Sequence, residues 1–164
     1  MQTNLPDTEG KVALVEFDDA GANLGLARLP QVKRSEAEWQ RILKPAQYYA
    51  TRQKNTDEPF TGTYHRLHDP GLYRCIGCDN AVFSSDAKYD SGTGWPSFWQ
   101  PIAKENVRIA ADGSPSLKSG IELICTLCDA HLGHVFDDGP APTNLRYCIN
   151  ESSLRFVPRT KAAQ

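Results

Sequence analysis

The sequence predicts a mainly β fold, made of antiparallel sheets with short N-terminal helices and a structural zinc site. From Phe60 onward, short β-prone runs alternate with Gly, Pro, Asn and Asp, and no helical pattern intervenes; this arrangement favours antiparallel sheets. Two CxxC units, separated by 46 residues, are available to hold two distant hairpins together. A chain of 164 residues suits one domain, which we place at residues 35–158, with an N-terminal extension (1–34) and a C-terminal tail (159–164).

The extension contains one β-prone run, VALVEF (Val12–Phe17), followed by the turn-rich stretch DDAGANLG and by LARLPQV. This pattern is compatible with a peripheral hairpin and with a mobile arm. The role of residues 1–34 is not indicated by any motif in them.

A helix is predicted to begin after Ser35. The segment SEAE forms a capping box, in which the Ser35 hydroxyl accepts from the Glu38 amide and the Glu38 side chain reaches back. Pro45 disfavours helical geometry at the preceding residue, so it ends this helix and suits the first turn of a second one through AQYYATRQ. The buried stripe of the first helix is expected to comprise Trp39, Ile42 and Leu43.

Seven later runs have the length and composition of strands, and turn-forming residues separate them. They read GLYRC, NAVFSS, NVRIA, GIELIC, HLGHVF, LRYCIN and LRFVP. The last pair before LRFVP is joined by DDGPAPTN, eight residues rich in turn formers, which predicts a hairpin between HLGHVF and LRYCIN.

Composition and charge exclude several classes of partner. The formal net charge of −2 and the pI near 6.1 provide no basic surface for nucleic acid or for an anionic membrane. No apolar run is long enough to span a bilayer, and the N-terminus lacks a basic segment leading into an apolar one. We therefore expect a cytoplasmic protein whose cysteines are reduced, without nucleic-acid or membrane partners.

The paired cysteines predict a metal site. Cys75 and Cys78 form one CxxC unit, Cys125 and Cys128 form the other, and two such units supply the four thiolates of a tetrahedral Zn²⁺ site. A closed site of this kind is structural, because no coordination position remains for a substrate. The alternatives are buried cysteines without metal, redox chemistry at one CxxC, and iron in place of zinc.

The fifth cysteine, Cys148, has no partner in a CxxC unit. Strand alternation in LRYCIN places Tyr147 and Ile149 on one face, suited to the core, and Arg146, Cys148 and Asn150 on the other. A guanidinium near a thiol favours the thiolate, which is the nucleophile. A lone strand cysteine, on the other hand, is more often inert than reactive.

The predicted hairpin would place His131 or His134 beside Cys148, which would supply a group that titrates near neutral pH. Each histidine has a simpler alternative as a buried, hydrogen-bonded residue or as a metal ligand. The conjunction of Arg146 and Cys148 on one face, opposite a pair of histidines, favours a reactive thiol.

The segment DSGTGWPSFW (Asp90–Trp99) combines small turn formers with Trp95, Phe98 and Trp99. It suits a loop that packs its aromatic side chains into the core. It also suits an apolar wall beside a thiolate, where an indole would accommodate a methyl or thioether group.

Four segments in order, YRCIGCDNAVFSS, SGTGWPSF, CDAHLGHVFDDGP and LRYCIN, resemble the B-type peptide methionine sulfoxide reductases, which reduce the R epimer of methionine sulfoxide. The resemblance runs from about Ser35 to Pro158. It implies a β-tent-like antiparallel fold and a structural zinc on Cys75, Cys78, Cys125 and Cys128. It also implies that the Cys148 thiolate attacks the sulfoxide sulfur and becomes a sulfenic acid.

The resemblance further implies roles for the surrounding side chains. Trp95 and Phe136 would line the pocket for the substrate methyl group, Arg146 would favour the thiolate, and Asp138 would support the site by orienting a histidine. The residues expected to position and protonate the sulfoxide oxygen are His131, His134 and Asn150.

One position departs from the family pattern. Many members carry a resolving cysteine in the loop that here reads SGTGW, where this chain has Thr93. The remaining cysteines are expected to bind zinc, so the oxidised Cys148 should be reduced by an external thiol, either thioredoxin-like or small. The substrate would be methionine R-sulfoxide, free or in oxidised proteins or peptides.

Two other functions are weighed against this one. A zinc-ribbon module that binds protein or nucleic acid would explain the CxxC units, but it would leave the face of Arg146, Cys148 and Asn150 unexplained. A thiol oxidoreductase working through one CxxC would leave Cys148 without a role. The sequence does not indicate the oligomeric state.

Overall fold

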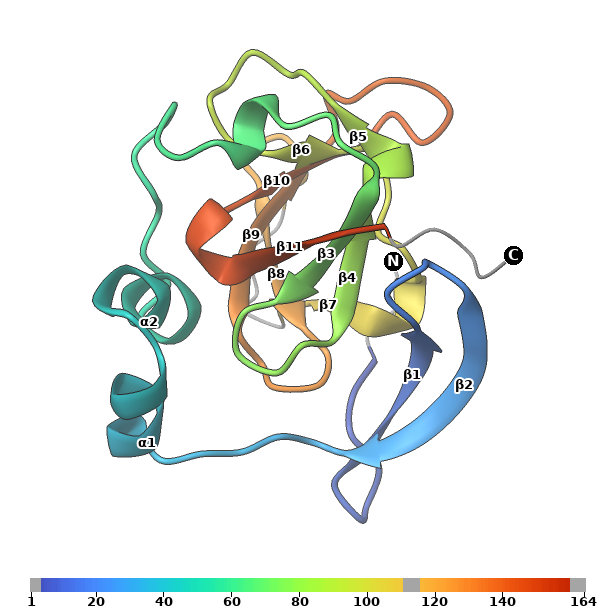
Figure 1. The fold of residues 1–164 in the computed structure, drawn as a ribbon, viewed down its shortest axis with the longest axis vertical. Coiled ribbons are helices and arrows are strands. Elements are labelled where there is room, and N and C mark those ends of the chain that lie inside the picture. The colour runs from blue at the N-terminus through green and yellow to red at the C-terminus, as the bar shows by residue number, and fades with distance from the viewer. Residues whose placement is uncertain (1–3, 111–115, 160–164) are drawn as a thin grey trace.

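The structure is a computed structural model that describes residues 4–110 and 116–159 (Figure 1). Within these ranges the chain forms a six-stranded sheet, a three-stranded sheet, a two-stranded hairpin and two short α-helices. All strand pairings among them are antiparallel, which confirms the predicted mainly β fold. Of the predicted C-terminal tail, only Arg159 lies within the described residues.

The larger sheet carries most of the β-prone runs of the second half of the chain. It includes the predicted hairpin of HLGHVF with LRYCIN, which is β9 paired with β10. Two strands of only two residues at its edge were not predicted. In spatial order the strands are β5 (Lys88–Tyr89), β6 (Ser97–Phe98), β10 (Arg146–Ile149), β9 (His131–Phe136), β8 (Ile121–Cys125) and β7 (Val107–Ile109).

The smaller sheet packs on the larger one through aromatic rings. Phe83 stacks on Phe98 of the larger sheet with ring centroids 4.4 Å apart, and Tyr73 meets the same ring edge-on at 5.1 Å. The rings of Phe83, Phe98 and Tyr73 are fully buried, so this contact forms the centre of the core. The strands of the smaller sheet, in order, are β11 (Leu154–Pro158), β3 (Gly71–Cys75) and β4 (Ala81–Ser84).

The N-terminal extension forms the hairpin of β1 (Lys11–Phe17) and β2 (Asn23–Pro30). It lies across the sheets from the two helices, at the lower right of Figure 1. Asn106, which is fully buried, joins it to the domain: its Oδ1 accepts from the Val15 amide at 2.9 Å, and its Nδ2 donates to the Val15 and Ala81 carbonyls at 2.8 Å. The Asn106 side chain thus bonds the backbone of β1 at Val15 in the way that a residue of a neighbouring strand would.

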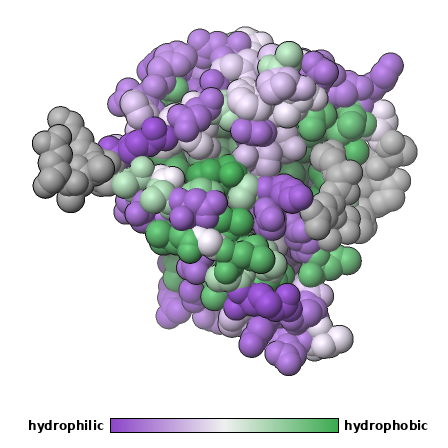
Figure 2. Space-filling view, turned by 90° about the vertical axis from the view of Figure 1, so that its right-hand side faces the viewer, coloured by the Kyte–Doolittle hydropathy of each residue, from purple (hydrophilic) through white to green (hydrophobic). Residues whose placement is uncertain are grey.

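The outer strand of this hairpin contributes apolar surface. Figure 2 looks onto the hairpin side and shows hydrophobic surface gathered near the middle of the face, with hydrophilic surface around it. Leu24 and Leu26 on β2 are 63% and 65% exposed. In the described part of the chain β2 pairs with β1 alone, so its other edge is a free strand edge.

Both helices form where the capping signals predict them. α1 (Glu36–Ile42) has Ser35 as its N-cap, and the Glu38 amide donates to the Ser35 hydroxyl at 3.2 Å. α2 (Pro45–Arg52) begins with its proline. The two helices lie side by side at the left of Figure 1, joined by a short link.

The buried stripe of α1 is shorter than predicted. Trp39 and Leu43 are buried, but Ile42 is 46% exposed, so the prediction for Ile42 was wrong. The helix ends at Ile42 and Leu43 already has extended backbone, which turns Leu43 inward and leaves Ile42 on the outer side. Trp39 packs under the Arg52 guanidinium, 4.6 Å from the ring centroid, and against Gly77, whose added Cβ would lie 3.4 Å from the ring.

Four short 3₁₀ segments complete the described secondary structure. Among the described residues, no helix is both long and apolar enough to cross a lipid bilayer. The 3₁₀ segments are η1 (Tyr64–Arg66), η2 (Ser85–Ala87), η3 (Lys104–Asn106) and η4 (Glu151–Ser153).

Candidate active site and metal centre

Both CxxC units have the same backbone geometry. β3 ends at Cys75 and β8 ends at Cys125, and each strand is followed by a tight turn. The turns close through Asp79 (φ 64°) and Asp129 (φ 62°), whose amides each donate to the carbonyl of the first cysteine at 2.9 Å. Aspartate tolerates this left-handed backbone better than most residues with a side chain.

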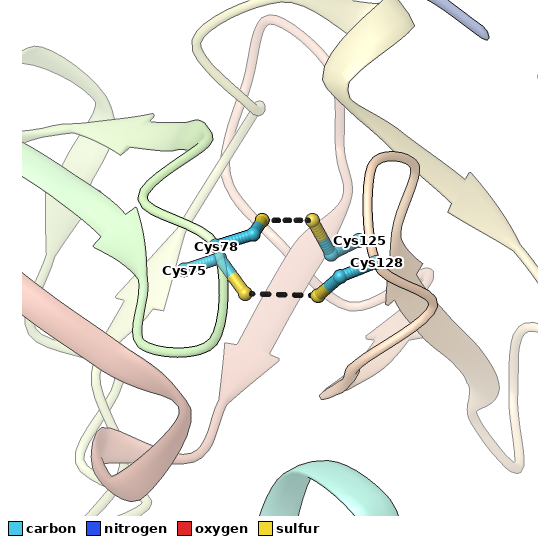
Figure 3. A group of neighbouring side chains, drawn as sticks. All are labelled: Cys75, Cys78, Cys125 and Cys128. Carbon is cyan, nitrogen blue, oxygen red and sulfur yellow. Dashed lines mark hydrogen bonds between the residues drawn. The ribbon is translucent and has the colours of Figure 1, made fainter. Parts of the chain in front are cut away.

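The two units face each other and bring their four sulfur atoms together (Figure 3). Cys75 Sγ lies 3.6 Å from Cys128 Sγ, Cys78 Sγ lies 3.6 Å from Cys125 Sγ, and all four atoms lie within 4.8 Å of one another. Around a zinc ion with bonds of about 2.3 Å, tetrahedral sulfurs would stand about 3.8 Å apart. The four cysteines could therefore hold a metal ion, and thiolates suit both zinc and iron.

The pKa values of Cys125 and Cys75 differ from their ordinary values, as expected for thiols that lie this close together. Burial opposes charge on Cys125, but hydrogen bonds from the other three thiols and from Asn80 outweigh it and hold the Cys125 pKa well below its ordinary value. Hydrogen bonds with the neighbouring thiols, together with burial, raise the pKa of Cys75 well above its ordinary value. A bound cation would favour the thiolate form of these cysteines.

A second group of side chains forms a row across the larger sheet. Cys148 on β10 lies directly opposite His134 on β9, and on its other side directly opposite Ser97 on β6. The row continues to Tyr89, which pairs with Ser97, and to Glu122, which pairs with His134. Directly opposed residues share one face of a sheet. The row therefore contains a thiol, an imidazole, a carboxylate and two hydroxyl groups on adjacent strands.

The opposite face of β10 packs into the core, as predicted. Tyr147 is 7% exposed and Ile149 is fully buried. This burial fixes the register of β10, because a slip of one residue would move Cys148 to the core face.

The Cys148 thiol is partly buried, and its surroundings have opposing effects on its pKa. Burial raises its pKa, whereas the charge of Arg146 and hydrogen bonds from Thr93 and Arg146 lower it without overcoming the burial. Cys148 is therefore predominantly a thiol near neutral pH. A base must take its proton before it can act as a nucleophile.

Thr93 was noted in the sequence only as the residue in place of a cysteine, but it contacts Cys148. Its hydroxyl lies 2.7 Å from Ser91 Oγ, which in turn lies 2.8 Å from Ser97 Oγ. The three hydroxyl groups form a chain beside the thiol. The spacing S-x-T-x-x-x-S in SGTGWPS was the sequence signal for it.

Arg146 is held in place by Asp138. Its Nε and Nη2 donate to the two carboxylate oxygens at 2.8 and 3.1 Å, and its guanidinium lies 4.2 Å from the centroid of the Phe136 ring. This ion pair lowers the pKa of Asp138. Asp138 was expected to orient a histidine, but its described partner is Arg146. In the pairing of β9 with β10, Arg146 lies opposite Phe136, and Asp138 follows Phe136 by two residues, which brings it close to Arg146.

The carboxylate that contacts a histidine is Glu122, which sequence reasoning missed. His131 Nδ1 lies 2.7 Å from Glu122 Oε2, and both side chains are buried. Lys54 Nζ lies 3.1 Å from the other oxygen of Glu122. Burial would raise the Glu122 pKa, but the contacts with His131 and Lys54 outweigh it and lower the pKa. The sequence signal was a single charged residue within the otherwise apolar run GIELIC.

Asn150 and Trp95 meet at one loop. The Trp95 Nε1 donates to the Asp57 carbonyl at 2.9 Å. Asn150 Oδ1 accepts from the Asp57 amide at 3.0 Å, and its Nδ2 donates to the Asn55 carbonyl at 2.9 Å. Asn150 is 3% exposed and follows the end of β10. Oδ1 and one N–H of Nδ2 therefore hold the backbone beside the indole, and the role of Asn150 at the sulfoxide oxygen stays a prediction.

Of the predicted site residues, the structure thus brings His131, His134, Arg146 and Cys148 to one face of the larger sheet. The rings of His131 and His134 lie edge to face with centroids 5.3 Å apart. Phe136 and Asp138 join this group through Arg146, and Trp95 joins it through the loop that leads into Ser97. The four paired cysteines form the separate cluster.

Residues 43–158 match the model of the SelR domain. A protein of Hahella chejuensis named peptide methionine sulfoxide reductase MsrB is 50% identical over 128 residues, which are 78% of this chain and 91% of the relative. Proteins with the same name from Methanosarcina barkeri and Pseudomonas aeruginosa are 47% and 52% identical, over 81% and 74% of this chain and 93% and 91% of their own chains.

Proposed function

The chain belongs to the SelR-domain family, and on this premise we propose that it reduces methionine R-sulfoxide to methionine with Cys148 as the nucleophile. The observation that carries the proposal is the cross-strand pair of Cys148 with His134, beside the guanidinium of Arg146. A thiol and a group that can move its proton lie on adjacent strands. The proposed substrate is methionine R-sulfoxide, either free or in oxidised proteins and peptides.

In the proposed first step, Cys148 takes the oxygen atom of the sulfoxide. The thiolate attacks the sulfoxide sulfur, and a transient bond forms between the two sulfur atoms. The oxygen then bonds to the Cys148 sulfur, while the bond between the two sulfurs and the bond between oxygen and the substrate sulfur both break. The substrate sulfur is reduced by two electrons, and the Cys148 sulfur is oxidised by two electrons to a sulfenic acid. The proton that leaves the thiol ends on the transferred oxygen, so atoms and charges balance within the site.

The histidines are proposed to move this proton. Because burial keeps Cys148 as a thiol, a base must act first, and His134 lies directly opposite it. Sulfoxide oxygen is a poor leaving group until it is protonated, so an imidazole must also act as the acid. His131, whose ring contacts that of His134, is the second group for this task. Arg146 stabilises the thiolate once it forms.

Trp95 and Phe136 are proposed to hold the substrate methyl group. Trp95 is fixed by its bond to the Asp57 carbonyl, and Phe136 lies against the Arg146 guanidinium. Fixed aromatic faces would place the methyl group and so select one epimer at sulfur. Asn150 holds the loop at Asp57 beside this wall, and it is also proposed to position the sulfoxide oxygen, since its amide nitrogen carries two N–H donors.

Regeneration is proposed to use an external thiol. The other four of the five cysteines belong to the metal cluster, and Thr93 lies where an internal resolving thiol would act. An external thiolate would attack the sulfenic sulfur and release water, and a second thiol would then free Cys148 and leave a disulfide. The reductant would be thioredoxin-like or a small thiol. The predicted cytoplasmic location, where such thiols stay reduced, is part of this proposal.

The metal cluster is proposed to bind structural zinc. Cys75, Cys78, Cys125 and Cys128 would hold it, and when bound it would supply a cross-link between the turn after β3 and the turn after β8. A closed set of four thiolates offers no position for the substrate. The metal would therefore act on stability and leave the chemistry to Cys148.

The test is turnover of racemic methionine sulfoxide with dithiothreitol as reductant, followed by separation of the two epimers. The R epimer should be consumed, the S epimer should remain, and consumption should vanish in Cys148→Ser. Unchanged turnover in Cys148→Ser would refute the assignment of the nucleophile. Trapping of the oxidised enzyme with a sulfenate-specific reagent tests the intermediate, and a stable internal disulfide of Cys148 would contradict it.

A further inference from the structure

Glu122 is a buried carboxylate in the middle of an apolar strand. It is 6% exposed, and its neighbours in β8 are core residues such as Leu123. An ionised carboxylate is costly to bury unless it is paired and hydrogen-bonded. Here both of its oxygens are used: Oε2 lies 2.7 Å from His131 Nδ1 and Oε1 lies 3.1 Å from Lys54 Nζ. These two contacts therefore offset the cost of burying the Glu122 carboxylate.

The contact with His131 fixes the roles of the imidazole nitrogens. A carboxylate can only accept, so Nδ1 must carry its proton when it faces Glu122. The other nitrogen, Nε2, is buried and has no hydrogen-bond partner among the described residues. His131 is 3% exposed, so this atom is not simply solvated. It is thus the atom of His131 that remains available for exchange of a proton.

The pair is connected to the reacting thiol through His134, which lies on the strand between β8 and β10. Glu122 is the cross-strand partner of His134, and His134 is the cross-strand partner of Cys148. His131 stacks edge-on against His134. A cavity of about 150 Å³ reaches the pair from the side of α2. The charged and titratable groups around His131 are Glu122, Lys54 and His134, with Arg52 and Asp129 on the cavity wall.

We propose that Glu122 is a positioning residue of the reductase reaction, which acts by holding His131 through Nδ1 and so presenting Nε2 to the proton transfer at Cys148. This inference rests on the proposed function and deepens it. Glu122 does not touch the substrate, and Lys54 keeps its second oxygen occupied. The neutralising charge of Lys54 lets Glu122 stay ionised beside the imidazole, which agrees with its lowered pKa.

A purely structural role is the competing explanation, because losing a partner from a buried pair destabilises a fold. The two roles differ in kcat. A structural residue changes the amount of folded enzyme, whereas a positioning residue changes kcat per folded, thiol-titrated active site and leaves KM nearly unchanged. They also differ in coupling, since a residue that acts through His131 should have no further effect once His131 is replaced.

The experiment therefore compares Glu122→Gln, His131→Asn and the double variant, each as full-length protein with its metal content measured. Glu122→Gln is nearly isosteric and should lower kcat about 10- to 100-fold with KM within about twofold, in the range for loss of an acid–base contribution. The double variant should be no slower than His131→Asn alone. A kcat for Glu122→Gln equal to that of the wild type, or multiplicative effects in the double variant, would overturn the proposal.

Two further measurements keep the test decisive. Glu122→Asp retains the negative charge, so its kcat should be higher than that of Glu122→Gln. If Glu122→Gln does not fold, Glu122→Asp alone decides the test. A folded Glu122→Asp variant that has the kcat of the wild type but no carboxylate contact at His131 would overturn the proposal. Proton NMR should show a downfield imidazole N–H signal that disappears in Glu122→Gln.

The matched control is Asp86→Asn, an exposed carboxylate whose described ion-pair partner is Arg159; it should change neither kcat nor the NMR signal. If the wild type consumes neither epimer, the proposed function itself fails, independently of the variants.

Discussion

Cys148 lies directly opposite His134 in the antiparallel pairing of β10 with β9. The pair depends on the hairpin register, which the buried faces of Tyr147 and Ile149 enforce. In the proposed mechanism His134 is the base that takes the proton of this thiol, whose pKa is raised by burial.

Arg146→Met should make Cys148 less reactive at neutral pH. Burial raises the thiol pKa and Arg146 lowers it, so loss of the guanidinium leaves the burial effect less opposed and raises the pKa further. The rate of alkylation by iodoacetamide, measured against pH, should therefore rise at higher pH in the variant than in the wild type. The control is Arg155→Met, whose exposed guanidinium faces Asp79. A profile that moved to lower pH would contradict the proposed effect of Arg146.

Thr93→Cys should create an internal disulfide with Cys148 after one turnover. Thr93 lies close enough to Cys148 to lower the pKa of the thiol, so a thiol at this position should reach the sulfenic acid. Peptide mass mapping after single-turnover oxidation should find the cross-link, and trapping of the sulfenic acid should fall sharply. Thr93→Val is the matched control and should form no cross-link. Persistent sulfenic acid in Thr93→Cys would show that the two side chains do not meet.

Cys125→Ser should lose the bound metal and much of the stability, whereas Cys148→Ser should keep both. Structural zinc sites contribute apparent free energies of about 10 kcal/mol or more, and Cys125 is one of the four clustered cysteines that could hold a metal ion. Metal content by elemental mass spectrometry and thermal unfolding of each variant provide the measurements. The metal found in the wild type would also distinguish zinc from iron. Equal metal content in the two variants would contradict the assignment of the ligands.

Asn106→Leu should detach the N-terminal hairpin and lower the free energy of unfolding by about 3 kcal/mol or more. The reason is that the Val15 amide and the carbonyl groups of Val15 and Ala81 lose their hydrogen-bond partner. Urea unfolding provides the measurement. The control is Asn23→Ala, which removes one exposed hydrogen bond to Gly25 and should cost much less. Equal stability of the wild type and Asn106→Leu would show that the hairpin contributes little to the fold.

Much of the secondary structure could be predicted from local sequence patterns. The capping box at Ser35 and Glu38 predicted the start of α1, because its hydrogen bonds join residues three apart in the chain. Alternation in LRYCIN predicted which residues of β10 face the core. The same reasoning failed at Ile42, where the helix was too short for its stripe to continue.

The site was predicted less completely. The CxxC spacing identified the metal cluster, and the turn-rich link between two β-prone runs predicted the pair of Cys148 with a histidine. The ion pair of Asp138 with Arg146 and the hydrogen bonds of Asn150 to the backbone near Asp57 were not predicted. Both side chains have several polar groups within reach in sequence, and only the folded register selects Arg146 for one and the backbone near Asp57 for the other.

The sequence by itself therefore determined the fold class, the four metal-ligating candidates and the lone thiol, because these depend on spacing and periodicity along one stretch of chain. The tertiary structure alone decided that Glu122 contacts His131 through one carboxylate oxygen and Lys54 through the other, and that Thr93 lies where it lowers the pKa of Cys148. These contacts join residues from separate elements. Their formation depends on how strands and loops are placed by packing of the whole core, which no local pattern encodes.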